Sequence, residues 1–468
     1  MDNMQERIRQ WITAHEEDIL RDLGRLIQYR SVSELDPSQE KRYGEACAAA
    51  LEEFLAMGKE YGLDGFNREY RCGELIWDNG GKSIGLWGHL DVVPDNGEWV
   101  YPPYSLTRKG DFLIGRGVSD NKGPTVLSLY AVRCIRELGL PFHSTVRLFG
   151  GCAEETGMDD VEYYVKNYKA PDFNIVGDAG FPVCYAEKGV FDADLASPQL
   201  SGDVVELKAG TVTNIVPDLA QLTLKLTDAV TSGLSRLPAD LSAEKGDGVV
   251  TVTARGLAKH SAMPEGSCNA IGKLLDGVLQ AGLLGKSDAK ALGFIRDICV
   301  VYDGDPVGVR FSDEESGPLT CVGSVVKTVD SKAVLSINIR YPVTTKEGWL
   351  EQQITAAATA AGYQVVHLDD NKPNYVDKNS FFVEALMNAY NQVTGENAEP
   401  YTMGGGTYAR KIPNAVAFGL SLPYDFSELG LPEGHGSYHC PDESYSVSLM
   451  LKGLEIYVLS LLELDKRI

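Results

Sequence analysis

The sequence predicts an α/β protein whose first domain is built on a mixed, largely parallel sheet flanked by helices, with an α+β domain inserted into it. Three observations lead to this fold class. Strand-like and helix-like segments alternate between residues 83 and 180, short alternating strands replace them from about Phe191, and 468 residues exceed the length at which one hydrophobic core usually keeps growing. We expect the first domain to comprise residues 1–187 and 374–468, and the inserted domain residues 188–373.

The first domain begins with helical patterns. Apolar residues recur at three- and four-residue spacing over residues 7–29, and a second helix is expected over residues 43–61. A third apolar helical segment covers residues 124–139 and ends on a glycine, the residue that most often closes a helix. From about Pro373 the chain returns to helices and to polar loops rich in Gly and His, which we expect to complete this domain.

Three short buried-strand patterns in the first domain each end in polar side chains. The segments are SIGLWGHLDVV (83–93), TVRLFGGCAEE (145–155) and FNIVGDAG (173–180). In a sheet with parallel strands covered by helices, functional residues gather outside the carboxyl ends of the strands. We therefore expect His89, Glu154 and Asp178 to lie at one edge of the sheet.

The inserted domain is predicted from short strands with alternating apolar and polar residues. These strands are VVELKAGTV (204–212), QLTLKLTD (221–228) and VVTVTARG (249–256). A helix is expected over residues 270–284, and a further strand over residues 333–341. This mixture is typical of an α+β domain.

Composition limits the classes of partner. The formal charge of −23 argues against nucleic acid, because binding to a phosphate backbone needs clustered Lys and Arg. Most of the acidic residues are expected on a solvated surface, and a fraction can bind cations. The cysteines are dispersed without a Cys-x-x-Cys pair, which predicts reduced thiols. The chain shows no secretory signal pattern and no apolar run near the roughly 20 residues that span a bilayer, so we expect a cytoplasmic protein without membrane contact.

His89 and Asp91 stand two positions apart, so on an extended backbone their side chains point to the same face. His89 can bind a metal ion through one ring nitrogen, while Asp91 accepts a hydrogen bond from the other ring nitrogen. A histidine at a strand end is more often structural, so both interpretations stay open at this point. Asp120, in a glycine-punctuated loop that leads into a helix, could bridge two cations or cap the helix.

The adjacent Glu154 and Glu155 follow a strand that should be buried, where two carboxylates are costly without counter-ions. Neighbouring residues on an extended chain point in opposite directions, so one can bind metal while the other faces a water molecule. A solvated pair is the ordinary alternative. Asp178 and His439, both in polar or Gly-containing loops, complete a donor set suited to zinc, manganese or cobalt.

Five ordered motifs resemble the metal-dependent peptidase family of carboxypeptidases, aminoacylases and dipeptidases. They are GHLDVVP, GVSDNKGP, AEETG, GDAG and YHCPDES, and together they span nearly the whole chain. The length, the GGGTYAR segment and the long inserted domain are most similar to the PepV-like broad-specificity dipeptidases. Many relatives carry an acidic residue at the position of Tyr408, a departure that favours the dipeptidase branch over the deacylases.

The resemblance implies two divalent metal ions, with zinc the first choice and manganese or cobalt as alternatives. His89 and Asp178 would bind one ion, Glu155 and His439 the other, and Asp120 would bridge them. It also implies that Glu154 is the general base that takes a proton from the attacking water, with Asp91 supporting His89.

The resemblance further implies that the inserted domain is a lid over the catalytic two-metal domain. His260 would stabilise the tetrahedral oxyanion, while Asn214 and Arg340 would bind the substrate backbone and its terminal carboxylate. The segment Gly404, Gly405 and Gly406 has two interpretations. It is either a flexible turn or a place where substrate approaches the backbone closely.

We therefore expect a dipeptidase that hydrolyses short peptides and prefers dipeptides, since a site that captures both termini measures length. A lid that supplies His260 within the same chain makes a monomer workable. The nearest alternatives are an N-acyl amino acid deacylase, similar to the succinyl-diaminopimelate desuccinylases, and a carboxypeptidase. A non-catalytic binding protein is the alternative from another class, although the presence of Glu154 argues against it.

Overall fold

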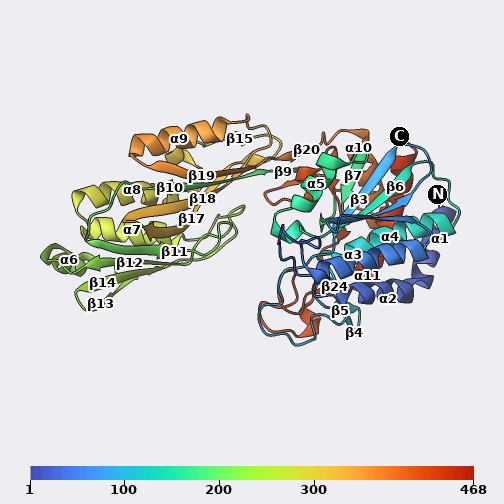
Figure 1. The fold of residues 1–468 in the computed structure, drawn as a ribbon, viewed down its shortest axis with the longest axis horizontal. Coiled ribbons are helices and arrows are strands. Elements are labelled where there is room, and N and C mark those ends of the chain that lie inside the picture. The colour runs from blue at the N-terminus through green and yellow to red at the C-terminus, as the bar shows by residue number, and fades with distance from the viewer. Residues whose placement is uncertain (1) are drawn as a thin grey trace. The chain divides into compact units, whose positions relative to one another are not determined.

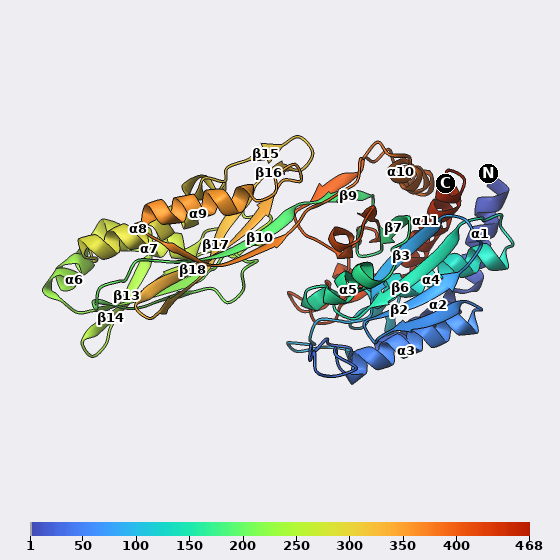
Figure 2. The same cartoon turned by 45° about the horizontal axis from the view of Figure 1, so that its top comes forward.

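The computed structural model describes residues 2–468 and divides into two compact units (Figures 1 and 2). Unit 1 contains the chain up to Ala186, Asn374–Tyr401 and Gly406–Ile468; unit 2 contains Glu187–Pro373 and Thr402–Gly405. Among the described residues, no helix is long and apolar enough to cross a membrane.

Unit 1 contains the helices from the first part and the last part of the chain. The α-helices are α1 (Asp2–Ala14), α2 (Glu16–Ile27), α3 (Glu45–Glu60), α4 (Lys122–Glu137), α5 (Asp159–Asn167), α10 (Phe381–Thr394) and α11 (Val447–Asp465). The short 3-10 turns are η1 (Glu154–Thr156), η4 (Tyr408–Lys411) and η5 (Ser427–Leu429). The helices predicted over residues 7–29, 43–61 and 124–139 are confirmed as α1 with α2, α3 and α4.

A nine-stranded mixed sheet forms the centre of unit 1. In spatial order its strands are β1 (Asp64–Arg68), β2 (Cys72–Trp77), β6 (Thr145–Gly151), β3 (Ser83–His89), β7 (Phe173–Val176), β22 (Ala415–Ala417), β9 (Cys184–Glu187) and β20 (Asn374–Tyr375), while β21 (Tyr401–Met403) pairs with β9. The central strands β6, β3, β7 and β22 are parallel, whereas β1, β2 and β9 pair antiparallel. The predicted mixed sheet flanked by helices is confirmed.

The central strands are buried on both faces, as expected when helices cover a parallel sheet. Trp87 of β3 lies beside Phe149 of β6, and their rings stack with centroids 3.6 Å apart. Tyr164 of α5 packs edge-on against both rings. At the ends of the same two strands His89 is paired with Gly151, so this packing also sets the position of the histidine.

Smaller sheets in unit 1 join segments that are distant in sequence. One contains β24 (Ser444–Ser446), β5 (Phe112–Ile114) and β4 (Thr107–Lys109), and another contains β23 (Leu420–Ser421) and β8 (Ala179–Gly180). Because β24 pairs with β5, the polar segment after His439 lies beside the loop that precedes Asp120.

Unit 2 is built on an eight-stranded antiparallel sheet. In spatial order its strands are β13 (Leu241–Lys245), β14 (Val249–Arg255), β12 (Leu219–Lys225), β11 (Val204–Ala209), β17 (Thr320–Val329), β18 (Lys332–Tyr341), β10 (Gly189–Ala196) and β19 (Gln364–Asn371). The other elements are α6 (Asp228–Gly233), α7 (Ala270–Ala281), α8 (Lys286–Val300), α9 (Trp349–Ala361), η2 (Leu234–Arg236), η3 (Asp305–Val307), β15 (Ser312–Asp313) and β16 (Gly317–Pro318). The predicted α+β class is confirmed.

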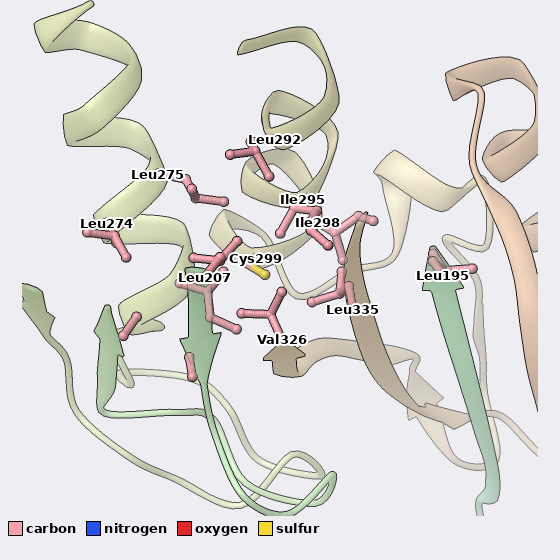
Figure 3. Close-up of a cluster of buried hydrophobic side chains, with 14 of the residues drawn as sticks. Leu195, Leu207, Leu274, Leu275, Leu292, Ile295, Ile298, Cys299, Val326 and Leu335 are labelled. Carbon is pink, nitrogen blue, oxygen red and sulfur yellow. The ribbon is translucent and has the colours of Figure 1, made fainter. Parts of the chain in front are cut away.

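Alternate side chains of this sheet pack against the helices to form one hydrophobic core (Figure 3). Leu207 and Val326 come from the strands, and Leu274 and Ile295 come from α7 and α8. Helices α8 and α9 were not predicted. In α9 the buried residues are Leu350, Ile354 and Ala358, too few to give a clear apolar pattern in an alanine-rich segment.

Candidate active site

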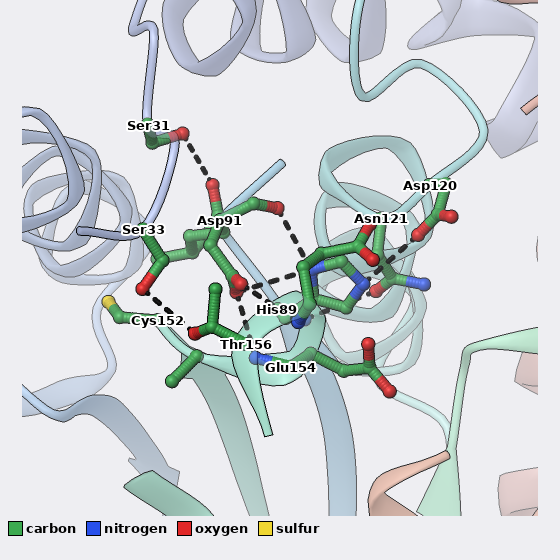
Figure 4. A network of polar contacts seen from close by, with 12 residues as sticks. Ser31, Ser33, His89, Asp91, Asp120, Asn121, Cys152, Glu154 and Thr156 are labelled. Atoms are coloured by element: carbon green, nitrogen blue, oxygen red, sulfur yellow. Dashed lines mark hydrogen bonds and ion pairs between the residues drawn. The ribbon is translucent and has the colours of Figure 1, made fainter. Parts of the chain in front are cut away.

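Most of the predicted site residues of unit 1 lie at the carboxyl ends of its central strands, and Figure 4 shows His89, Asp120 and Glu154 among them. His89 is the last residue of β3, Glu154 and Glu155 lie in η1 after β6, Asp178 follows β7, and Asp120 lies two residues before α4. Two groups of side chains offer ligand atoms that lie within 4.8 Å of one another. These groups are His89 with Glu154 and Asp178, and His89 with Asp120 and Glu155.

His89 is fully buried, and its two ring nitrogens face different groups. Nδ1 lies 2.9 Å from the backbone carbonyl oxygen of Asp91, which can only accept a hydrogen bond. Nδ1 therefore carries the hydrogen and Nε2 faces the carboxylates, 3.0 Å from Oδ1 of Asp120 and 3.8 Å from Oδ1 of Asp178. This tautomer leaves Nε2 available to a metal ion.

The carboxylate of Asp120 lies between two histidines. Its Oδ1 contacts His89, and its Oδ2 lies 2.9 Å from Nε2 of His439. The same His439 nitrogen lies 3.2 Å from Oε1 of Glu155. Asp120 is not the helix cap that was the alternative, because Asn121 occupies the N-cap position of α4 and its side chain makes no capping bond. One carboxylate with a histidine at each oxygen is suited to bridging two cations.

The donor set of this site fits divalent cations. Oε1 of Glu155 is buried and forms no hydrogen bond of acceptable geometry, although His439 lies within ion-pair distance. Within residues 2–468, no Lys or Arg forms an ion pair with the carboxylates of Asp120, Glu154, Glu155 or Asp178. Four clustered carboxylates with only histidines beside them need positive charge.

Protons supply part of that charge when no cation is bound. Burial raises the pKa of Glu154 well above its ordinary value, and the charge of Asp178 adds to the rise. The neighbouring carboxylates of Asp120 and Glu155 raise the pKa of His439 to about 11. Burial alone would raise the pKa of Asp120, but hydrogen bonds from His439 and His89 outweigh burial and lower it. Divalent cations would compete with these protons for the same atoms.

Glu154 and Glu155 do not lie on an extended chain as predicted, and that local prediction is wrong. They begin a 3-10 turn, and both of their backbone N–H groups donate to the carboxylate of Asp91, at 3.3 and 3.1 Å. Gly157, with φ of +112°, then reverses the chain. The two glutamates still differ in surroundings: in the described part of the chain the Glu154 carboxylate forms no hydrogen bond or ion pair, whereas that of Glu155 faces His439.

Asp91 therefore touches more of the site than its predicted contact with His89. Its Oδ1 lies 3.4 Å from Nδ1 of His89, farther away than its own carbonyl oxygen. Its carboxylate is fully buried and accepts from the turn that carries both glutamates. One residue thus joins the end of β3 to the turn after β6.

Asn121 was not among the predicted site residues, yet it contacts two of them. Its amide nitrogen donates to Oδ1 of Asp178 at 3.0 Å and to the carbonyl of Gly177 at 2.7 Å. Its amide oxygen accepts from the backbone N–H of His89 at 3.3 Å. The only signal in the sequence was its place beside Asp120, and a lone Asn in a polar loop has too many other roles to be singled out.

A second unpredicted contact joins Asp160 to Tyr408. The Tyr408 hydroxyl donates to Oδ2 of Asp160 at 2.5 Å, and the same oxygen accepts from the N–H groups of Cys152 and Ala153 at 2.7 and 2.9 Å. Burial raises the pKa of Asp160 to about 7. This pair holds the backbone immediately before Glu154.

The other predicted residues lie in unit 2, except Gly406 of unit 1, and several of those in unit 2 contact one another. The Arg340 guanidinium donates to the carbonyl oxygen of Gly404 at 3.1 Å and to Oδ1 of Asn338 at 3.0 Å. Asn214 and His260 are exposed and lie on adjacent segments, because the carbonyl of Asn214 accepts from Ser261 at 2.9 Å. Partial desolvation of the His260 ring lowers its pKa, and the Arg340 charge lowers it further.

The three predicted glycines differ in their surroundings. A Cβ at Gly404 would lie 2.8 Å from the Cβ of Ala262, so this position is glycine because it packs closely against the segment after His260. A Cβ at Gly405 would meet nothing within 4 Å, whereas one at Gly406 would collide with the Arg410 side chain. Packing thus accounts for Gly404, whereas at Gly406 the flexible end of the Arg410 side chain could move aside.

Comparison with known proteins agrees with the five sequence motifs that resemble metal-dependent peptidases. The model for peptidase family M20/M25/M40 matches residues 85–463. A Bacillus subtilis (strain 168) protein named "Putative dipeptidase YtjP" is 29% identical over 476 residues, which cover 97% of this chain and 99% of that protein. A Staphylococcus epidermidis protein named "Putative dipeptidase" is 27% identical over 425 residues, which cover 87% of this chain and 90% of that protein.

Solved structures share the fold at low sequence identity. Human carnosine dipeptidase 1 has a TM-score of 0.60 and 14% identity, with 99% of each chain covered. The aminoacylhistidine dipeptidase of Vibrio alginolyticus has a TM-score of 0.57 and 12% identity, with 96% of each chain covered. The resemblance of the motifs is confirmed: the chain belongs to peptidase family M20/M25/M40 and is a metallopeptidase, a hydrolase that acts on peptide bonds.

Proposed function

We propose that this protein is a dipeptidase that hydrolyses short peptides at a pair of divalent metal ions. The observation that carries the proposal is the carboxylate of Asp120, with His89 at one oxygen and His439 at the other. The relatives named as dipeptidases, which align along most of this chain, support the substrate class.

The division of ligands between the two ions follows the resemblance to the family, and the contacts of Asp120 support it. His89 and Asp178 would hold the first ion, Glu155 and His439 would hold the second, and Asp120 would bridge them. Mixed nitrogen and oxygen donors suit zinc, with manganese or cobalt as alternatives. When bound, the ions polarise the scissile carbonyl and make water easier to deprotonate.

Glu154 acts as the general base and then as the general acid. Its carboxylate lies beside the ligands without a hydrogen-bond partner in the described structure, so it can accept a proton from the attacking water. Burial and the neighbouring Asp178 charge raise its pKa, which makes it a stronger base than an exposed glutamate. It later delivers the proton to the leaving amine.

Unit 2 supplies the substrate contacts in this proposal, with residues 188–373 as a lid domain. His260 stabilises the oxyanion, Asn214 binds the substrate backbone, and Arg340 binds the terminal carboxylate. The contact between Arg340 and Gly404 supports this assignment, because it holds the guanidinium beside the glycine segment. A site that holds both termini of a substrate prefers dipeptides over longer chains.

A substrate panel tests the proposal. Metal-loaded protein is assayed on dipeptides, tripeptides, longer peptides, and acetyl- and succinyl-amino acids, with chelator-treated protein as the control. We expect rapid cleavage of dipeptides, slower cleavage of longer peptides, and loss of activity on chelation. Preferential cleavage of acyl-amino acids would instead identify a deacylase, and equal cleavage of long and short peptides would contradict the length argument.

A further inference from the structure

Glu443 is a buried carboxylate in unit 1 that none of the assigned roles uses. It lies directly before β24, and its side chain is 1% exposed. A buried carboxylate is costly unless hydrogen bonds and an opposite charge compensate it. The contacts of Glu443 therefore indicate what this carboxylate does in the fold.

All five hydrogen bonds to this carboxylate come from the loop that ends at Asp120. Oε2 accepts from Nη1 of Arg116 at 2.8 Å and from the N–H of Gly117 at 3.1 Å. Oε1 accepts from the N–H and the hydroxyl of Ser119 at 2.9 and 3.0 Å, and from the N–H of Asp120 at 3.1 Å. The loop thus wraps around one anion supplied by a distant part of the chain.

The backbone of the loop is shaped for this contact. Gly117 has φ of +93°, a conformation that favours glycine and turns successive N–H groups toward one side. The backbone N–H of Gly115 also donates to the carbonyl oxygen of Glu443 at 2.9 Å. The main chain and the side chain of Glu443 therefore hold the same loop.

The loop that Glu443 holds ends in Asp120, whose carboxylate lies between His89 and His439. The Asp120 N–H is fixed by Glu443, while the Asp120 side chain contacts His89 and His439. Arg116 supplies the counter-charge, and its guanidinium lies over the Trp99 ring, 5.0 Å from the centroid. We propose that Glu443 is a positioning residue that holds Asp120 in the orientation needed to bridge two metal ions, an inference that rests on the proposed function.

The test compares Glu443→Gln with Glu74→Gln. Gln keeps the shape of the side chain but removes its charge and turns one acceptor into a donor that faces N–H groups. Glu74 is a matched control, because it is also fully buried and accepts from Arg68 and Arg147, on a strand that carries no metal ligand. Zinc affinity is measured by competition with a chromogenic chelator, and unfolding by urea.

We expect Glu443→Gln to weaken zinc binding by about tenfold to a hundredfold, the usual effect of losing a residue that orients a metal ligand. Both variants should lose stability, but Glu74→Gln should keep its zinc affinity within about twofold. A zinc affinity in Glu443→Gln within about twofold of wild type would overturn the inference, provided that Asp120→Ala weakens zinc binding. If Asp120→Ala also leaves zinc binding unchanged, the proposed ligand set fails, and the inference fails with it.

Ser119→Ala keeps the test decisive if Glu443→Gln does not fold. This variant removes only the hydroxyl contact with Oε1 of Glu443, and it should weaken zinc binding by about threefold. Ser144→Ala is its control, because the Ser144 hydroxyl donates to the buried Asp465 in a part of unit 1 that carries no ligand. Equal zinc affinity in the two serine variants would overturn the inference.

Discussion

The polar residues of unit 1 and those of unit 2 are held in different ways. In unit 1, His89 and Asp91 are fully buried, and other buried groups fix their orientation. In unit 2, Arg340 is anchored by Asn338 and Gly404, but His260 is exposed, and within residues 2–468 its ring accepts a single hydrogen bond, from the N–H of Ala262. The difference indicates that the fold preorganises the proposed metal site, whereas the proposed oxyanion donor is open to a substrate.

The largest effect should come from Glu154, the one carboxylate of the metal site that forms no hydrogen bond or ion pair in the described structure. Glu154→Gln should lower kcat by about 10²- to 10⁴-fold while two metal ions remain bound, because the variant loses a general base but no ligand. Glu155→Gln should instead release metal. Steady-state kinetics together with metal analysis of the dialysed variants separates the two roles, and metal loss in Glu154→Gln would contradict the assignment.

His260→Ala should have the next largest effect and act on catalysis alone. Removing one donor to a developing oxyanion typically lowers kcat by about 10²- to 10³-fold. Metal content should stay unchanged, since His260 belongs to unit 2 and the ligands to unit 1. His367→Ala is the control, because His367 is another exposed histidine of unit 2, on β19. Similar rates in both variants would remove His260 from the mechanism.

Arg340→Lys should affect recognition of the substrate carboxylate. Lysine keeps the charge but lacks the planar fork that contacts both Asn338 and Gly404, so we expect kcat/KM for dipeptides to fall roughly tenfold. Dipeptide amides lack the carboxylate, and their kcat/KM should change little. Arg255→Lys, at an exposed position of β14, should match wild type on both substrates. An equal loss on amides and acids would show that Arg340 has a structural role only.

Most of the proposed metal ligands could be singled out in the sequence because each stands in a short motif at the end of a recognisable strand. His89, Glu155 and Asp178 follow apolar segments whose parallel pairing brings their ends together. The shape of the turn at Glu154 could not be predicted, since it depends on the Asp91 carboxylate, which lies 63 positions earlier in the chain.

The residues that support the ligands could not be predicted for the same reason. Asp160 meets its partner Tyr408 across 248 positions, and Glu443 meets Arg116 across 327. In the sequence, each is one acidic residue among 66, and nothing local distinguishes a buried carboxylate from a solvated one. Helix α9 was also missed in the sequence. Alanine favours helix, but the few buried residues of α9 give a weak apolar pattern.

The last expected effect concerns stability instead of catalysis, and it tests how firmly unit 1 holds the backbone before Glu154. Burial raises the pKa of Asp160 to about 7 in the folded protein, from an ordinary value of 3.8. Between about pH 4 and 7 the folded state therefore binds a proton that the unfolded state has released. The free energy of unfolding should fall as pH rises through this window, with Asp160 contributing up to roughly 1.4 kcal/mol per pH unit.

Asp160→Asn removes this titration, so its urea unfolding free energy, measured with chelator present, should depend less on pH between 4 and 7 than that of wild type. Tyr408→Phe removes a hydrogen bond that lowers the Asp160 pKa, so its stability should keep falling to a higher pH than in wild type. Parallel pH profiles for wild type and Asp160→Asn would mean that Asp160 stays ionised in the folded protein. Its four hydrogen-bond donors would then outweigh the cost of burial. The backbone before Glu154 would in that case be held by an ionised carboxylate.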